Sequence, residues 1–137
     1  MRMLTGIILA VLFAYTPIVH AAELVMFTSP GCEWCEAWEN EVGIIYNKTD
    51  EARVAPLRRL DIDAPRPGSL STIRPVMYTP TFVVMDGDSE IGRIAGYPGE
   101  AFFWGMLSEM ISRSENSISG CATSQVATLS ADTGGKC

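Results

Sequence analysis

The sequence has 137 residues, of which 16 are acidic and 10 basic, giving a formal net charge of −6 at pH 7. Phosphate binding requires a basic patch, so this balance argues against a nucleic-acid-binding protein. The length fits one ordinary domain. The single histidine, His20, lies in a segment that we expect to be removed, which argues against histidine-based catalysis and histidine metal ligation.

The first 21 residues have the three-part layout of a secretory signal peptide. One basic residue precedes an apolar stretch at residues 7–15, and a short segment then leads to Ala21-Ala22. A retained membrane anchor needs about 20 apolar residues, and Thr16-Pro17 interrupts this stretch sooner. We therefore expect residues 1–21 to be a cleaved signal peptide and the mature protein to be periplasmic, where disulfides persist.

The pattern that follows predicts a strand, a helix and a second strand. Residues 23–28 are short, apolar and β-prone, and they end at Ser29-Pro30-Gly31, which is typical of a turn. From Cys32 onward apolar residues recur at helical spacing, up to an exit near residues 47–50. Residues 54–62 then predict a second strand.

The second half predicts a hairpin and a closing helix. Residues 63–68 are a loop, and residues 69–73 have room for one helical turn. Two strands at residues 81–85 and 90–95 are joined by an Asp-Gly turn, and residues 99–113 form an amphipathic helix. This order predicts an α/β domain at residues 22–113, with a mixed four-stranded sheet and helices on both faces.

Residues 114–137 are rich in serine, threonine, glycine and alanine, which predicts a flexible tail. The tail contains Cys121 and Cys137. We favour a plain disulfide between them, or loose thiols, over a relay with the other cysteines or a bond to another protein.

The other two cysteines, Cys32 and Cys35, stand at the predicted junction of strand and helix. Backbone N–H groups and the helix dipole stabilise a thiolate at Cys32, which lowers its pKa and makes it the candidate nucleophile. Cys35 lies on the apolar face with Trp38, where it is more protected. It is the candidate resolving thiol, which attacks the mixed disulfide that Cys32 forms with a partner.

Other uses of this spacing fit less well. Structural zinc requires four ligands, and the remaining cysteines lie far apart in a polar tail. Haem attachment requires a histidine after the second cysteine, where Glu36 stands. We expect no metal and no other cofactor, and an inert structural disulfide stays open as an alternative.

Residues 23–113 resemble the thioredoxin superfamily. The resemblance rests on a strand followed by Cys-Glu-Trp-Cys opening a helix, and on Tyr78-Thr79-Pro80 leading into the hairpin. It implies a thioredoxin-like fold in which Pro80 is cis beside the dithiol, and in which the backbone of Thr79 pairs with the substrate. Trp34, expected at the rim of the site, is a further candidate for substrate contact; alternatively its ring folds over its own helix.

Within the superfamily, segments such as Pro-Gly-Cys-Glu-Trp-Cys-Glu-Ala-Trp and Gly-Tyr-Pro-Gly-Glu are similar to the periplasmic thioredoxins of bacterial sulfur-oxidation operons. This similarity implies a thiol:disulfide oxidoreductase that reactivates a SoxY-like sulfur-carrier protein. It also implies an inner-membrane thiol transporter of the DsbD or CcdA kind as electron donor. Two alternatives stay open: a disulfide oxidase or isomerase for secreted proteins, and a non-catalytic binding module with a structural disulfide.

The sequence departs from cytosolic thioredoxins at two points. Their Gly-Pro between the cysteines is Glu33-Trp34 here, and their buried aspartate is replaced by Met26. Glu39 is therefore a candidate for the group that deprotonates Cys35. A negative charge at Glu33 opposes a thiolate on its neighbour, and strong oxidants depend on a very stable thiolate, so we expect a reductant.

Overall fold

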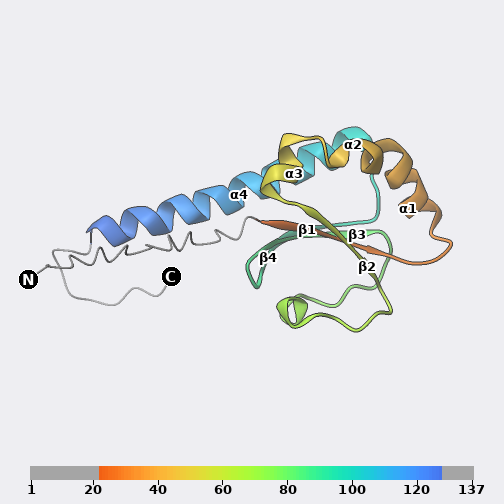
Figure 1. Cartoon of the computed structure of the whole chain (residues 1–137), viewed down its shortest axis with the longest axis horizontal. Helices are drawn as coiled ribbons and strands as arrows, with labels where there is room; N and C mark the ends of the chain where they lie inside the picture. The colour runs from red at the N-terminus through yellow and green to blue at the C-terminus, as the bar shows by residue number, and fades with distance from the viewer. Residues whose placement is uncertain (1–21, 128–137) are drawn as a thin grey trace, which may run out of the picture.

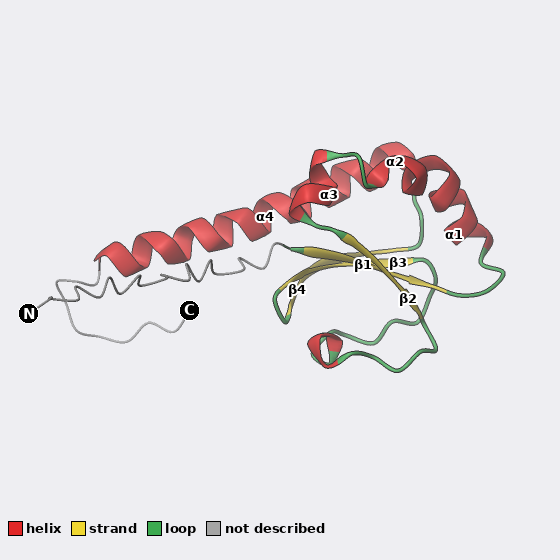
Figure 2. Cartoon of the chain, viewed as in Figure 1, coloured by secondary structure: helices red, strands yellow, loops and turns green. Residues whose placement is uncertain are grey.

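The computed structural model describes residues 22–127, with side chains to residue 116, so the expected signal peptide at residues 1–21 lies outside the described residues. Four strands form one sheet in the order β2-β1-β3-β4. Their bounds are Glu23–Thr28 for β1, Leu57–Asp61 for β2, Thr81–Asp86 for β3 and Ser89–Ala95 for β4. β1 is parallel to β2 and antiparallel to β3, and β3 pairs antiparallel with β4 (Figure 2). The predicted mixed four-stranded sheet is confirmed.

The first helical stretch is continuous but changes its winding. Helix α1 (Glu33–Trp38) passes into the π-helical turn η1 (Glu39–Gly43) and then into α2 (Ile44–Tyr46). A separate short helix α3 (Asp50–Val54) follows, capped by the Thr49 hydroxyl, which accepts the Ala52 N–H at 3.3 Å. The predicted start of the second strand at residue 54 is therefore wrong, because the capped helix extends to that point.

The last helix, α4 (Glu100–Ala127), has 28 residues. The predicted end at Arg113 is wrong, and residues 114–127 of the expected flexible tail are helical. Extending a helix that is already packed costs little, since each added residue gains one hydrogen bond. Figure 1 shows the C-terminal half of α4 running beyond the sheet. Cys121 lies in this half, and Cys137 lies outside the described residues.

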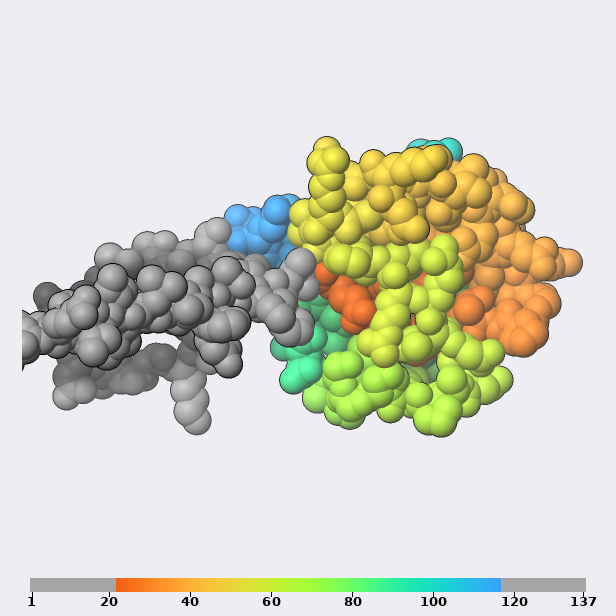
Figure 3. All heavy atoms as spheres, in the orientation of Figure 1, coloured from red at the N-terminus to blue at the C-terminus, as the bar shows by residue number. Residues whose placement is uncertain are grey.

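The two faces of the sheet bury different layers, because alternate residues of a strand point to opposite faces. Helices α1 to α4 cover one face, where Trp38, Phe103 and Leu107 pack on strand residues that include Met26 and Phe82. The other face is covered by the segment between β2 and β3, which contains the 3₁₀ turn η2 (Gly68–Leu70). Figure 3 shows this segment, in yellow-green, as the lower layer of the domain. Helices therefore lie on both faces, although the second face has a single helical turn.

An aromatic cluster fixes the helices over the first face. The Trp38 ring lies 5.0 Å from that of Phe82 and 5.5 Å from that of Phe103, measured between centroids. Tyr46 stacks on Trp104 at 6.0 Å. The predicted place of Trp38 on the buried face of its helix is confirmed. Because Trp38 is fully buried one turn after Cys35, the cluster also fixes the start of α1.

Between residues 22 and 127, no helix is long and apolar enough to cross a membrane.

Candidate active site

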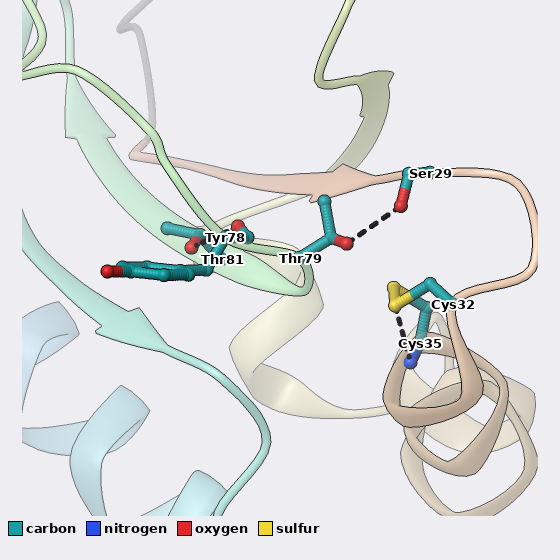
Figure 4. Close-up of a disulfide and its surroundings, with 6 residues drawn as sticks. All are labelled: Ser29, Cys32, Cys35, Tyr78, Thr79 and Thr81. Atoms are coloured by element: carbon teal, nitrogen blue, oxygen red, sulfur yellow. Dashed lines mark hydrogen bonds between the residues drawn. A yellow bond between two sulfur atoms is a disulfide. The ribbon is translucent and has the colours of Figure 1, made fainter.

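Cys32 and Cys35 form a disulfide at the first turn of α1 (Figure 4). Their Cα atoms are 5.2 Å apart, within the range that a disulfide bridges. The chain enters the helix through Gly31, whose φ of 72° is a left-handed conformation that favours glycine. The predicted junction of a buried strand, a tight turn and a helix is therefore confirmed, and it places both sulfur atoms at the helix N-terminus.

The two cysteines differ in exposure and in hydrogen bonding. Cys35 is 5% exposed, whereas Cys32 is half-buried and is the N-cap of α1. The Cys32 Sγ accepts the backbone N–H of Cys35 at 3.2 Å. In the reduced protein the same N–H group is placed to stabilise a Cys32 thiolate, because hydrogen bonds to an anionic acceptor are stronger than those to a neutral one. The expected difference between an accessible outer sulfur and a protected inner one is present.

The loop that precedes β3 lies beside the disulfide (Figure 4). The Thr79–Pro80 bond is cis, as the resemblance implied. The Thr79 and Ser29 hydroxyl groups are 2.8 Å apart, which joins this loop to the turn before Cys32. At the start of β3 the Thr81 hydroxyl donates to the carbonyl of Tyr78 at 2.7 Å. The structure thus brings Thr79, Pro80 and the two cysteines to one place.

Sequence reasoning missed Ser29, which links the two loops of the site. The available signal was a polar, hydrogen-bonding residue in the turn that precedes the cysteine pair. Nothing in the sequence indicated that its partner would be Thr79, 50 residues later in the chain.

The two segments that meet at this site carry exposed apolar side chains. Trp34, between the two cysteines, is 64% exposed, in keeping with its expected place at the rim of the site. Met77 and Tyr78, just before Thr79, are each 72% exposed. Figure 4 shows the Tyr78 ring pointing away from the disulfide. Trp34 is therefore an exposed apolar side chain in the helical turn that carries both cysteines, whereas the Tyr78 ring is directed away from them.

Glu39, the candidate base for Cys35, forms an ion pair with Arg59. Its carboxylate accepts the Arg59 Nε–H at 2.5 Å and an Arg59 Nη2–H at 2.7 Å. A Cβ atom at Gly43 would collide with Glu39 Oε2, so this carboxylate occupies the space that the glycine leaves. The ion pair ties the helix to β2, and the role of Glu39 as the base for Cys35 stays a prediction. Met26, at the position of the family's aspartate, is fully buried.

Within the described part of the chain, no three or more His, Cys, Asp or Glu side chains are grouped to hold a metal ion.

A disulfide with one reachable and one buried sulfur, at a helix N-terminus beside a cis-proline loop, performs thiol–disulfide exchange. These features, on this mixed sheet, define a thiol:disulfide oxidoreductase of the thioredoxin fold. The chain belongs to the thioredoxin superfamily. It is similar to the periplasmic thioredoxin SoxS from Paracoccus pantotrophus, whose reduced form is known from a crystal structure. The two are 50% identical with a TM-score of 0.64, over 66% of this chain and 96% of that one. No protein-family model matches the sequence, and neither does any curated protein.

Proposed function

We propose that the chain is a periplasmic reductant that reactivates a SoxY-like sulfur-carrier protein by dithiol–disulfide exchange. The observation that carries this proposal is the asymmetric cysteine pair, in which Cys32 is reachable and hydrogen-bonded by a helix N–H while Cys35 lies behind it. The 50% identity to a periplasmic thioredoxin supports the compartment.

The reaction transfers two electrons in two exchange steps. The Cys32 thiolate attacks one sulfur of the partner's disulfide, and the partner's other sulfur leaves as a thiolate. The Cys35 thiolate then attacks Cys32 Sγ, which releases the partner's remaining sulfur. The chain ends as the Cys32–Cys35 disulfide, and the partner gains two electrons and, after protonation, two thiols.

We infer that three residues hold the partner during exchange. The backbone of Thr79, next to cis Pro80, lies beside the disulfide and offers N–H and C=O groups to an extended segment. The 64% exposed Trp34 ring offers an apolar contact. We assign substrate binding to Thr79, Pro80 and Trp34 on this basis.

The charge around the site favours reduction over oxidation. Glu33 and Glu36 both lie in the first turn of α1, and negative charges there oppose a Cys32 thiolate. A strong oxidant needs the opposite arrangement. We expect a reduction potential nearer to the roughly −270 mV of thioredoxin than to the roughly −120 mV of DsbA, measured by equilibration with a glutathione buffer. A value near that of DsbA would support the alternative role, an oxidase or isomerase for secreted proteins.

The partner is best identified by trapping. In the Cys35→Ala variant the mixed disulfide through Cys32 cannot be resolved, so a periplasmic extract from cells oxidising sulfur should contain the chain bound to its substrate. The expected adduct is a sulfur-carrier protein, and the Cys32→Ser, Cys35→Ala double variant is the control that should trap nothing. Adducts with many unrelated secreted proteins would contradict the proposal. A Cys32→Ser variant with full biological activity would instead support a binding module with a structural disulfide.

Two further parts of the proposal have their own tests. N-terminal sequencing of the protein recovered from the periplasm should start after Ala21 or Ala22. Deleting a DsbD- or CcdA-like thiol transporter should leave the Cys32–Cys35 pair oxidised in the cell, because that transporter is the expected electron donor. A pair that stays reduced would exclude that donor.

A further inference from the structure

A partly buried ion pair on β4 contacts the loop that leads to the active site. Glu90 and Arg93 have side chains that are 10% and 16% exposed, and Arg93 Nη2 lies 2.6 Å from Glu90 Oε2. The Arg93 Nε–H also donates to Glu90 Oε1 at 2.7 Å, which makes the pair bidentate. Such pairs hold their geometry more firmly than single contacts.

Both members of the pair also bind the backbone of the loop. The Arg93 guanidinium donates to the carbonyl oxygens of Arg74 and Pro75, each at 3.0 Å. Glu90 accepts the backbone N–H of Arg74 at 3.2 Å and the Arg74 side chain at 2.7 Å. These bonds hold the main chain of residues 74–75 against β4.

A β-bulge makes this arrangement possible. In a regular strand, residues three positions apart face opposite sides of the sheet. Here the register shifts between Val84, which pairs with Gly92, and Met85, which pairs with Glu90. The extra residue is Ile91, and it brings Glu90 and Arg93 to the face that the loop covers. The bulge therefore directs both charged side chains at the same loop.

The other end of the loop is also held. Val76, directly after the clamped residues, is 7% exposed in the second core layer. After the cis bond, the carbonyl of Pro80 accepts the Gly96 N–H at 2.7 Å. Between these anchors lies the segment Met77–Thr79, which contains the exposed Met77 and Tyr78 side chains.

From these contacts we propose that Glu90 and Arg93 are positioning residues. They hold the Met77–Pro80 segment in the position, relative to the cysteine pair, in which its backbone can bind a protein substrate. Neither residue touches the sulfur atoms. The inference rests on the thiol–disulfide exchange activity and not on the identity of the sulfur carrier.

This role predicts that the two residues matter for some substrates and not for others. A protein disulfide must align its own chain along Thr79 while its sulfur approaches Cys32, so a displaced loop lowers the rate of exchange. A small aromatic disulfide has no chain to align, so it reacts at a rate set by the cysteines alone.

The test uses the full chain with two probes, insulin as a protein disulfide and 5,5′-dithiobis(2-nitrobenzoic acid) as a small one. In Arg93→Lys, the positive charge is kept. The lysine ammonium lacks the planar guanidinium that donates at the same time to the Arg74 and Pro75 carbonyls and to the Glu90 carboxylate. In Arg93→Met, the charge is lost as well. We expect about tenfold lower kcat/KM with insulin, and less than a twofold change with the small disulfide. Glu90→Gln should behave in the same way.

The matched control is Arg53→Lys, which makes the same chemical change in an exposed ion pair with Asp50, where the side chains are 79% and 89% exposed. It should leave both rates unchanged. Hydrogen exchange of the Gly96 amide, which donates to the Pro80 carbonyl at the end of this segment, gives an independent readout. It should rise in the Arg93 variants while the β1 amides stay protected. Equal losses with both probes, unchanged rates with both, or unchanged exchange at Gly96 would each overturn the proposal.

Discussion

Acidification should remove a defined part of the stability, because the Glu90 carboxylate is held in its charged form by two arginines. Hydrogen bonds from Arg93, and then from Arg74, lower the pKa of Glu90 from 4.5 to about 2, against the opposing effect of burial. Below pH 4.5 the unfolded chain binds a proton at this position that the folded chain does not bind. The contribution is therefore complete above about pH 4.5 and is lost as the pH falls towards 2.

The size of the effect follows from the two pKa values. One pKa unit corresponds to about 1.4 kcal/mol, so by pH 3 the contribution of Glu90 falls by about 2 kcal/mol. The assay is urea unfolding of the natural protein and of Glu90→Gln at pH 7 and pH 3. Other carboxylates titrate in both proteins, so the difference in unfolding free energy isolates Glu90 and should shrink by about 2 kcal/mol at pH 3.

The control for this measurement is Asp50→Asn, which removes a carboxylate from an exposed ion pair. Exposed pairs contribute little to stability, so its difference from the natural protein should stay nearly constant with pH. A difference for Glu90→Gln that is equal at the two pH values, or larger at pH 3, would refute the reasoning.

Two substitutions test the core that fixes the site, each against an exposed residue of the same type. The buried Tyr46 hydroxyl donates to the carbonyl of Ala55 at 2.7 Å, so Tyr46→Phe should lower the unfolding free energy by about 1–2 kcal/mol. Tyr78→Phe should not change it, since Tyr78 is 72% exposed. Phe103→Ala removes a fully buried ring and should cost about 3–5 kcal/mol. Phe102→Ala, one residue earlier and 72% exposed, should change the unfolding free energy by less than about 0.5 kcal/mol. A Tyr78→Phe or Phe102→Ala variant as unstable as its buried counterpart would contradict this description of the core.

The sequence was sufficient to predict the parts of the fold that depend on local patterns. Two short strand-like runs joined by an Asp-Gly turn predicted the hairpin of β3 and β4. The cysteine spacing after a strand predicted the disulfide at the start of a helix, and the family resemblance implied the cis bond at Pro80. These features are encoded within a few consecutive residues, which is why a single sequence reveals them.

The features that were missed depend on contacts between distant segments. Glu90 and Arg93 are three residues apart in a strand, which predicts opposite faces. The bulge at Ile91 that brings them to one face was missed, although Gly92 beside it is a residue that often marks a bulge. The ion pair between Glu39 and Arg59 was also missed, because it depends on the order of the strands in the sheet. The end of the last helix was missed because a polar composition does not by itself stop a helix that has already formed.

The central claim is that Cys32 carries the reactive sulfur and that Cys35, buried behind it, is the resolving thiol. The most direct measurement is limited alkylation of the reduced protein with iodoacetamide, followed by mass spectrometry of the peptide that contains both cysteines. We predict that the label appears on Cys32 at least about tenfold faster than on Cys35, because only the former combines access with a helix N–H to stabilise its thiolate. Equal labelling of the two sulfurs, or faster labelling of Cys35, would contradict the account.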